Sequence, residues 1–451
     1  MSTSLKAFKI ELYQEHLEEA SFLYEQRLGL LKDPEISWRG ISDFEERLEA
    51  HIDALVVGDE LALEVCKQRA QEGDFGELFA AVCVFCRQKR GSKLSEVFQA
   101  LDFKEEQKIR AVGDALKHEF PAEWGDALNQ ALARQDERLA PILAQLCGYR
   151  RIERGDLLHQ VLAANPAGAH PLLIRALGKL KWRSAEDSLV RCLQHPDENV
   201  CLEALLALLH IGELRPLQQC YLLAQSKRWP CIAFGLAGNR SAANLLKDLL
   251  KGGKANEDCV LALGLLGDLS AVKPLLECLA NPDLADAAAT ALHLITGAEM
   301  NEEVFVPEEI DEDELFENEL KAYKEEGKVP TRADGKPFGT TQITLSTDPE
   351  KWRAWLTQNA PRFDPNHRYR YGKLYSPKVL LEGLLADFTP YRIRQLTAEE
   401  LAIRYGLDIP FEADMPVNQQ IQALGKISRW AEEHAGKFQA GLWYFAGRVM
   451  T

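Results

Sequence analysis

Runs of Leu and Ala alternate with short polar turns along the middle of this 451-residue chain. Between about residues 138 and 297, an apolar run with helical spacing ends near a glycine, and a second apolar run follows after a polar turn. The glycines recur at intervals of 26 to 34 residues, at Gly148, Gly178, Gly212, Gly238, Gly267 and Gly297. We expect each glycine to close a helix, and a repeat of this length to form stacked helix pairs.

The segment 184–212 shows how one pair is specified. Pro196 ends its first helix, because proline lacks an N–H and its ring blocks helix continuation. In the second helix Val200, Ala204 and Leu208 lie on one face, and Gly212 can adopt the left-handed closing conformation. Neither helix can cover its apolar stripe alone, so we expect neighbouring pairs to stack into an α-solenoid.

The pattern divides the chain into four regions. The fold class predicted is all-α: a helical N-terminal region, either a cap or degenerate repeats, then short HEAT-like repeats, and a helical C-terminal region. An acidic segment and linker separate the last two, with 13 acidic and two basic residues between 299 and 326, a composition that buries little apolar surface. The four ranges are 1–135, 136–297, 298–345 and 346–451.

The C-terminal region begins and ends its helices with clear signals. Thr347 or Asp348 can cap a helix that contains Trp352 and Trp355. Thr397, with Glu400 three residues later, has the spacing of a capping box, and Gly406 can terminate the same helix. We therefore expect a helix that starts at Thr397.

Residues 351–378 carry seven Lys or Arg against one Asp, with tyrosines between them. For the part at 362–378, one interpretation is a docking patch, since Arg and Tyr are enriched in binding hot spots. The other is that this basic segment pairs with the acidic stretch 308–326, and the two tryptophans suit a buried helix face equally well. The candidate protein-binding residues are Trp352, Trp355, Arg362, Arg368, Tyr369, Arg370, Tyr371 and Lys373.

Three C-terminal stretches, at 352–356, 362–377 and 400–414, together with the repeats, resemble an uncharacterised bacterial HEAT-like family often encoded near type VI secretion loci. The resemblance implies an accessory role around secretion or its effectors. It brings no catalytic residues to this chain.

The net charge and the positions of the cysteines limit which cellular compartment and which classes of partner we expect. A net charge of −16 opposes general nucleic-acid binding, which needs a basic surface. No apolar stretch approaches the roughly 20 residues of a membrane span, and the first 20 residues lack the apolar core of a signal peptide. Ten cysteines lie between Cys66 and Cys278, mostly inside apolar runs, which is typical of reduced core thiols. The chain is therefore expected in the cytoplasm, with no nucleic acid and no membrane span.

Motifs that carry chemistry are weak in this sequence. Cys83 and Cys86 form a lone C-x-x-C in an apolar run, without the second pair that a zinc site needs. His118-Glu119 is the only His-Glu dipeptide, so a repeated iron-ligand pattern is absent. We predict a non-enzymatic scaffold, adaptor or chaperone without a cofactor, whose concave face and C-terminal patch bind a protein, possible partners being a secretion component or effector. The alternatives are an immunity-like inhibitor that sequesters an effector, and a HEAT-like lyase or metal hydroxylase.

Overall fold

The computed structural model describes residues 3–307, 315–331 and 335–450 of the chain. These residues are mostly helical, with 23 α-helices and three two-stranded antiparallel sheets. The predicted helical class is confirmed, whereas the strands were not anticipated by the pattern. Within the described residues, no helix combines the length and apolarity that crossing a bilayer requires.

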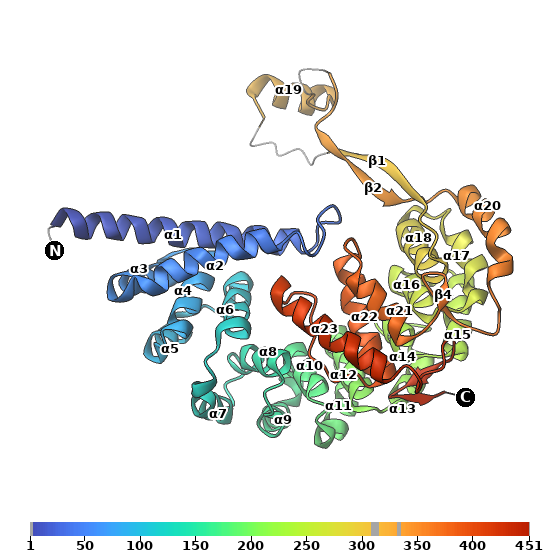
Figure 1. Cartoon of the computed structure of the whole chain (residues 1–451), viewed down its shortest axis with the longest axis horizontal. Coiled ribbons are helices and arrows are strands. Elements are labelled where there is room, and N and C mark those ends of the chain that lie inside the picture. Colours follow the sequence, from blue (N-terminus) through green and yellow to red (C-terminus); the bar gives the residue numbers. More distant parts are fainter. Residues whose placement is uncertain (1–2, 308–314, 332–334, 451) are drawn as a thin grey trace.

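The helices of the first two thirds of the chain form one curved row, in which each helix packs against its neighbours (Figure 1). The N-terminal region, predicted to be helical over 1–135, contains α1 to α7. The bounds of the row are α1 Thr3–Leu30, α2 Ser42–Val57, α3 Asp59–Glu72, α4 Phe75–Arg87, α5 Gly91–Ala100, α6 Glu106–Glu119, α7 Gly125–Ala133, α8 Ala140–Arg150, α9 Gly155–Ala164, α10 Pro171–Lys179, α11 Glu186–Cys192, α12 Glu198–Ile211, α13 Arg215–Leu223, α14 Cys231–Ala237, α15 Arg240–Lys251, α16 Glu257–Leu266, α17 Val272–Cys278 and α18 Pro282–Thr296.

The rest of the chain mixes helices with short hairpins. In Figure 1 the C-terminal helices α21 to α23 lie on the inner side of the curved row. The bounds are β1 Asn301–Pro307, α19 Glu317–Glu326, β2 Gly339–Leu345, α20 Pro349–Asn359, β3 Tyr369–Arg370, β4 Lys373–Leu374, α21 Pro377–Leu385, α22 Tyr391–Tyr405, α23 Val417–Glu433, β5 Tyr444–Phe445 and β6 Arg448–Val449.

The predicted turn signals act at several helix ends. Helix α11 ends before Pro196, and Asp197 then caps α12 by accepting a hydrogen bond from the Asn199 amide. Gly212, with φ 99°, closes α12 in the left-handed conformation. Gly267 and Gly297, with φ of 69° and 67°, do the same for α16 and α18. These three glycines therefore have the role that the sequence predicted.

Gly148 and Gly178 have a different role, because both lie inside helices (α8 and α10) and do not close them. A Cβ placed on Gly178 would lie 2.5 Å from the Cα of Ala207 in the next inner helix, α12. The same Gly-to-Ala approach recurs along the row in the pairs Gly148–Ala176, Gly235–Ala262 and Gly264–Ala291. These small residues thus set how closely successive helices on the inner side of the row pack, namely α8 on α10, α10 on α12, α14 on α16 and α16 on α18.

The C-terminal region covers part of the inner side of this row. Helix α22 contacts α12 and α14, strand β3 contacts α18, and α23 contacts α2 near the other end of the row. The expected open concave face is therefore occupied by the chain itself along this section.

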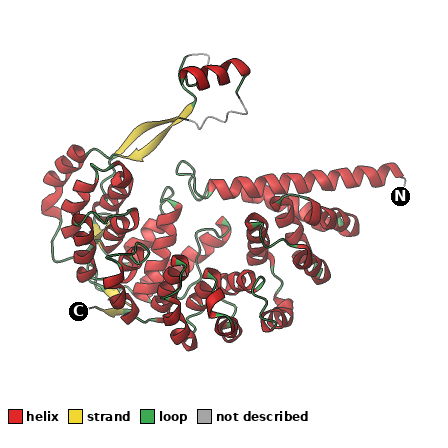
Figure 2. Ribbon diagram, turned by 180° about the vertical axis from the view of Figure 1, so that it is seen from behind, coloured by secondary structure: helices red, strands yellow, loops and turns green. Residues whose placement is uncertain are grey.

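The acidic segment also differs from expectation. Strand β2, Gly339–Leu345, was predicted as part of a linker, but it pairs in register with β1 from Asn301↔Leu345 to Pro307↔Gly339. The two strands and α19 project from the end of the row (Figures 1 and 2). We call residues 301–345 the arm. Residues 308–314 and 332–334 lie outside the described residues.

Substitution of Gly178 by Ala tests the close packing of the inner helices. The added methyl group would overlap the backbone of Ala207, so we expect Gly178→Ala to lower the free energy of unfolding by about 1–3 kcal/mol. Gly425→Ala is the matched control, because nothing lies within 4 Å of that helical position in α23. There alanine should stabilise by about 0.5–1 kcal/mol. Urea unfolding of both variants measures the two effects, and equal effects would contradict the close-packing role.

Candidate functional site

The first three candidate residues lie in and just after α20, and they differ in exposure. Trp352 is completely buried, and its indole N–H donates to the carbonyl oxygen of Ser346 at 2.7 Å. Trp355 is half-buried against Phe363, with the ring centroids 6.4 Å apart. Arg362 is exposed and donates to the side chain of Asn359 at 3.0 Å. Trp352 therefore fixes the segment that follows β2, and Arg362 alone of the three is exposed.

The other five candidates lie on the β3–β4 hairpin. Arg368, Tyr369 and Arg370 are buried, Tyr371 is half-buried, and Lys373 is exposed and paired with Glu382 at 2.8 Å. The buried side chains contact the chain's own helices, so the expected exposed basic patch does not exist at these positions. The partners of these side chains lie outside residues 315–326, the described part of the acidic stretch 308–326 that the sequence predicted as their partner.

Two buried arginines bind the ends of helices in the row. Arg368 donates to the carbonyl oxygens of Leu265 and Leu266, at 3.0 and 2.8 Å, at the end of α16. Arg404 of α22 donates to the carbonyls of Gly235 and Gly238, at 2.8 and 3.1 Å, at the end of α14. The last carbonyls of a helix lack intrahelical partners and form its negative end. Each guanidinium therefore attaches the C-terminal region to one helix end.

Backbone bonds reinforce this attachment. The amide of Tyr369 donates to the carbonyl of Gly267 at 2.8 Å, and the amides of Tyr371 and Gly372 donate to the last turn of α18, at 2.6 and 3.1 Å. The hairpin β3–β4 thus extends along the ends of two neighbouring inner helices.

A single carboxylate stands at the centre of the arginines. Glu400 is fully buried, forms an ion pair with Arg370 and accepts a hydrogen bond from the hydroxyl of Tyr375 at 2.5 Å. The guanidinium of Arg368 stacks on the Tyr375 ring at 3.4 Å from its centroid. Burial and the nearby Arg404 lower the pKa of Arg368 to about 10. Of the three buried guanidinium groups, Arg370 pairs with this carboxylate, whereas Arg368 and Arg404 bind helix-end carbonyls and Arg368 also stacks on an aromatic face. We call Arg368, Arg370, Tyr375, Glu400 and Arg404 the arginine cluster.

Glu400 and Arg404 were not among the predicted site residues. Helix α22 begins at Tyr391, so Thr397 lies inside it, and its hydroxyl donates to the carbonyl of Ile393 at 2.7 Å. The predicted capping box is therefore wrong, although Gly406 does end the helix with φ 75°. The residues next to Glu400 are the same whether this glutamate caps a helix or pairs with a buried arginine. Its role could therefore not be predicted from the local sequence.

A second charged contact joins α22 to the middle of the row. Lys179 of α10 lies 2.6 Å from Glu399 and 3.1 Å from Glu412, and His210 of α12 hydrogen-bonds Glu399. Burial opposes ionisation of Glu399, but Lys179 and His210 outweigh it and lower the pKa of this carboxyl well below its ordinary value. Glu399 therefore remains ionised and bridges two inner helices.

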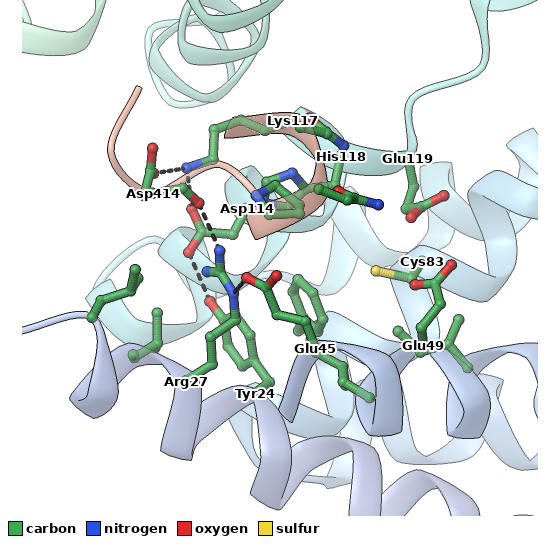
Figure 3. A pocket seen from close by; sticks show the side chains of 18 of the residues that line it. Tyr24, Arg27, Glu45, Glu49, Cys83, Asp114, Lys117, His118, Glu119 and Asp414 are labelled. Atoms are coloured by element: carbon green, nitrogen blue, oxygen red, sulfur yellow. Dashed lines mark hydrogen bonds and ion pairs between the residues drawn. The ribbon is translucent and has the colours of Figure 1, made fainter. Parts of the chain in front are cut away.

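A cleft of about 270 Å³ lies where the N-terminal helices meet the start of α23 (Figure 3). Lys117 of α6 bridges Asp114 and Asp414, with N–O distances of 2.8 and 2.7 Å. Arg27 of α1 pairs with Glu45 at 2.7 Å and donates to the backbone carbonyl of Asp414 at 2.8 Å. These charges connect α1, α2 and α6 with the C-terminal region.

The lining of the cleft offers little reactivity. The hydroxyl of Tyr24 donates to Asp114 at 2.8 Å, and burial of the phenol raises its pKa above the ordinary value. Burial raises the pKa of Cys83 well above its usual range, while burial and Lys117 lower the pKa of His118 to about 3. At neutral pH the thiol is protonated and the imidazole is neutral. Figure 3 shows that the central charged groups of the cleft pair with one another, between the N-terminal helices and the C-terminal region.

The cysteines, which were the other candidate metal ligands, are mostly buried as Cys83 is. Nine of the ten cysteines are buried, and burial raises the pKa of Cys86 to about 12. Across residues 3–307, 315–331 and 335–450, no three His, Cys, Asp or Glu side chains group in a way that could hold a metal ion.

No protein-family model matches the chain, and a search of curated proteins found no match.

Removal of the buried carboxylate tests the arginine cluster. We expect Glu400→Gln to cost about 3–5 kcal/mol of unfolding free energy, because the fully buried Arg370 loses its ion-pair partner. Glu382→Gln removes the same charge from the exposed pair with Lys373, and it should cost less than about 1 kcal/mol. Chemical unfolding monitored by tryptophan fluorescence compares the two variants. Similar costs would show that the cluster does not hold the C-terminal region.

Asp414 predicts a dependence of stability on pH. Burial opposes its ionisation, but Lys117 outweighs this and lowers the pKa to about 2. Because the unfolded-state value is about 3.9, the ionised carboxyl stabilises the fold above about pH 4, and this is lost as the pH falls toward 2. Asp414→Asn should cost about 1–2 kcal/mol at pH 7, and the difference from the parent should shrink between pH 4 and 2. A difference that stays constant in urea titrations across this range would contradict the assignment.

Proposed function

We propose that this chain is a non-enzymatic protein-binding scaffold, built as an α-solenoid of short HEAT-like helix pairs. The recurring Gly-to-Ala contacts between successive inner helices support the solenoid assignment. The joint between the C-terminal region and the row supports a scaffold role, because its charged groups hold helices in place. The resemblance to the secretion-associated family makes a component of type VI secretion or one of its effectors the proposed class of partner.

The observation that carries this proposal is the exposed apolar surface of the arm. Ile343 is 70% exposed, Phe316 is 75% exposed and Phe305 is 45% exposed. All three belong to an element that projects from the end of the row (Figure 2). An isolated two-stranded hairpin is only marginally stable in water, and contiguous exposed apolar surface marks interaction sites. Phe305 and Ile343 lie at diagonal positions on one face of this hairpin. The arm, in place of the concave face, is therefore the proposed contact with a partner.

The foot of the arm is firmly attached to the body. The Ser346 amide donates to the carbonyl of Met300 at 2.6 Å, the indole of Trp352 binds the Ser346 carbonyl, and Lys351 pairs with Glu302 at 2.7 Å. A partner bound to the arm would thus be held at a defined position relative to the solenoid. This is the property that a scaffold requires.

Shortening the arm tests the proposal. Replacing residues 303–343 by Asn-Gly leaves Glu302 opposite Thr344, a pairing that a two-residue turn can close. We expect the shortened chain to keep its thermal unfolding transition and to lose the proteins that the tagged full-length chain captures from its native host, as identified by mass spectrometry.

Arg362→Ala serves as the matched control, because it changes an exposed side chain of the C-terminal region and leaves the arm intact. It should retain the captured proteins. Capture by the shortened chain at the level of the full-length chain would contradict the role of the arm.

A further inference from the structure

The hairpin of the arm has one exposed side that is suited to strand pairing. The register of β1 and β2 places each residue of one strand opposite a residue of the other, and the Ser346 amide donates to the carbonyl opposite it, that of Met300. In an antiparallel pair, hydrogen-bonded and non-hydrogen-bonded positions alternate. The backbone groups of Glu302, Val304 and Val306 therefore point toward β2, and those of Glu303 and Phe305 point outward.

The outward groups of β1 are not covered by the rest of the described chain. The amides of Glu303 and Phe305 make no further hydrogen bond among the described residues. All residues of β1 from Glu303 to Pro307 are exposed, whereas β2 contacts α18 near its end. Because an unpaired strand edge is a template for another strand, the outer edge of β1 can accept one.

The faces of the hairpin add apolar contacts to this edge. Phe305 and Ile343 lie on the same face at diagonal positions of the register, and Val304 and Val306 lie on the opposite face. Val304 is 40% exposed and Val306 is 37% exposed. A third strand would extend both faces and cover part of these side chains.

Charge decides which strand fits. Residues 301–345 include 13 acidic and five basic residues, a net charge of −8. A second copy of the same arm would be repelled, and the whole chain carries −16. A basic segment would be attracted, which favours encounter and specificity.

We propose that the outer edge of β1, around Glu303 and Phe305, binds an extended, lysine- or arginine-rich segment of a partner protein as an added antiparallel or parallel strand. This inference rests on the proposed scaffold function and specifies its partner. Main-chain hydrogen bonds supply the affinity, and the acidic arm selects the sign of the partner's charge.

A ten-residue peptide of alternating Lys and Val serves as the probe for the full-length protein, with the Glu-Val peptide of equal length as its control. Fluorescence anisotropy should show binding of the Lys-Val peptide that weakens with added salt and no binding of the Glu-Val peptide. In the bound state, amide hydrogen exchange should slow at Glu303 and Phe305. Binding without this protection would overturn strand addition.

Two variants at one position separate the edge from the charge. Glu303→Pro removes an outward N–H and leaves the bonds to β2 intact, as proline allows on an edge strand. Glu303→Gln removes the same charge and keeps the N–H. We expect about a tenfold loss of affinity for Glu303→Pro and about a twofold loss for Glu303→Gln. Equal losses would overturn the proposal, as would a dimer of the unliganded chain in light scattering.

The outcome for native partners is distinguishable from the outcome for the probe. If the shortened arm loses captured proteins but the Lys-Val peptide does not bind, the scaffold function stands and strand addition fails. If the shortened arm still captures them, the scaffold function of the arm fails as well.

Discussion

The structure depends on the burial of arginine between the C-terminal region and the helix row. A guanidinium is costly to remove from water, and it remains charged at neutral pH. Arg368 and Arg404 offset this cost with helix-end carbonyls, and Arg370 does so with Glu400. Because the acceptors of Arg368 and Arg404 belong to α16 and α14, these two guanidinium groups gain them only when the C-terminal region is docked. Docking and burial are therefore mutually dependent.

This dependence gives the two ends of the chain a common framework. Glu399 links α22 to α10 and α12, and Asp414 links the chain before α23 to α6 and, through its backbone, to α1. A row of helix pairs contacts mainly its neighbours and can flex along its length. Crosslinks from a segment inside the curve oppose such flexing. The C-terminal region thus acts as an internal brace for the row.

The arm leaves the body at the point where the row ends and the brace begins. Its foot is fixed through Ser346 to Trp352, which is buried among the residues of the main core. The attached end at Ser346 and the exposed Phe305 and Ile343 lie at different positions of the same hairpin. The acidic composition keeps such a surface soluble and discourages pairing between copies, since like charges repel.

The sequence by itself determined the helices and many of their ends. Proline excludes helix continuation at 196, and the left-handed conformation favours glycine at 212, 267, 297 and 406, so these signals act within a few residues. Local signals failed where distant groups compete. Position 178 requires glycine because the backbone of Ala207 approaches it closely. Thr397 does not cap a helix, because α22 already begins at Tyr391.

The tertiary structure alone decided where the basic–aromatic segment packs and that Asn301–Pro307 pairs with Gly339–Leu345. A sequence rich in Arg and Tyr has the same composition whether it faces a partner or the chain's own helix ends. Only the positions of Leu266, Gly235 and Glu400 in space give these buried arginines their acceptors. Strand β2 likewise forms because β1 lies beside it in register, and pairing partners distant in the chain leave little trace in local composition.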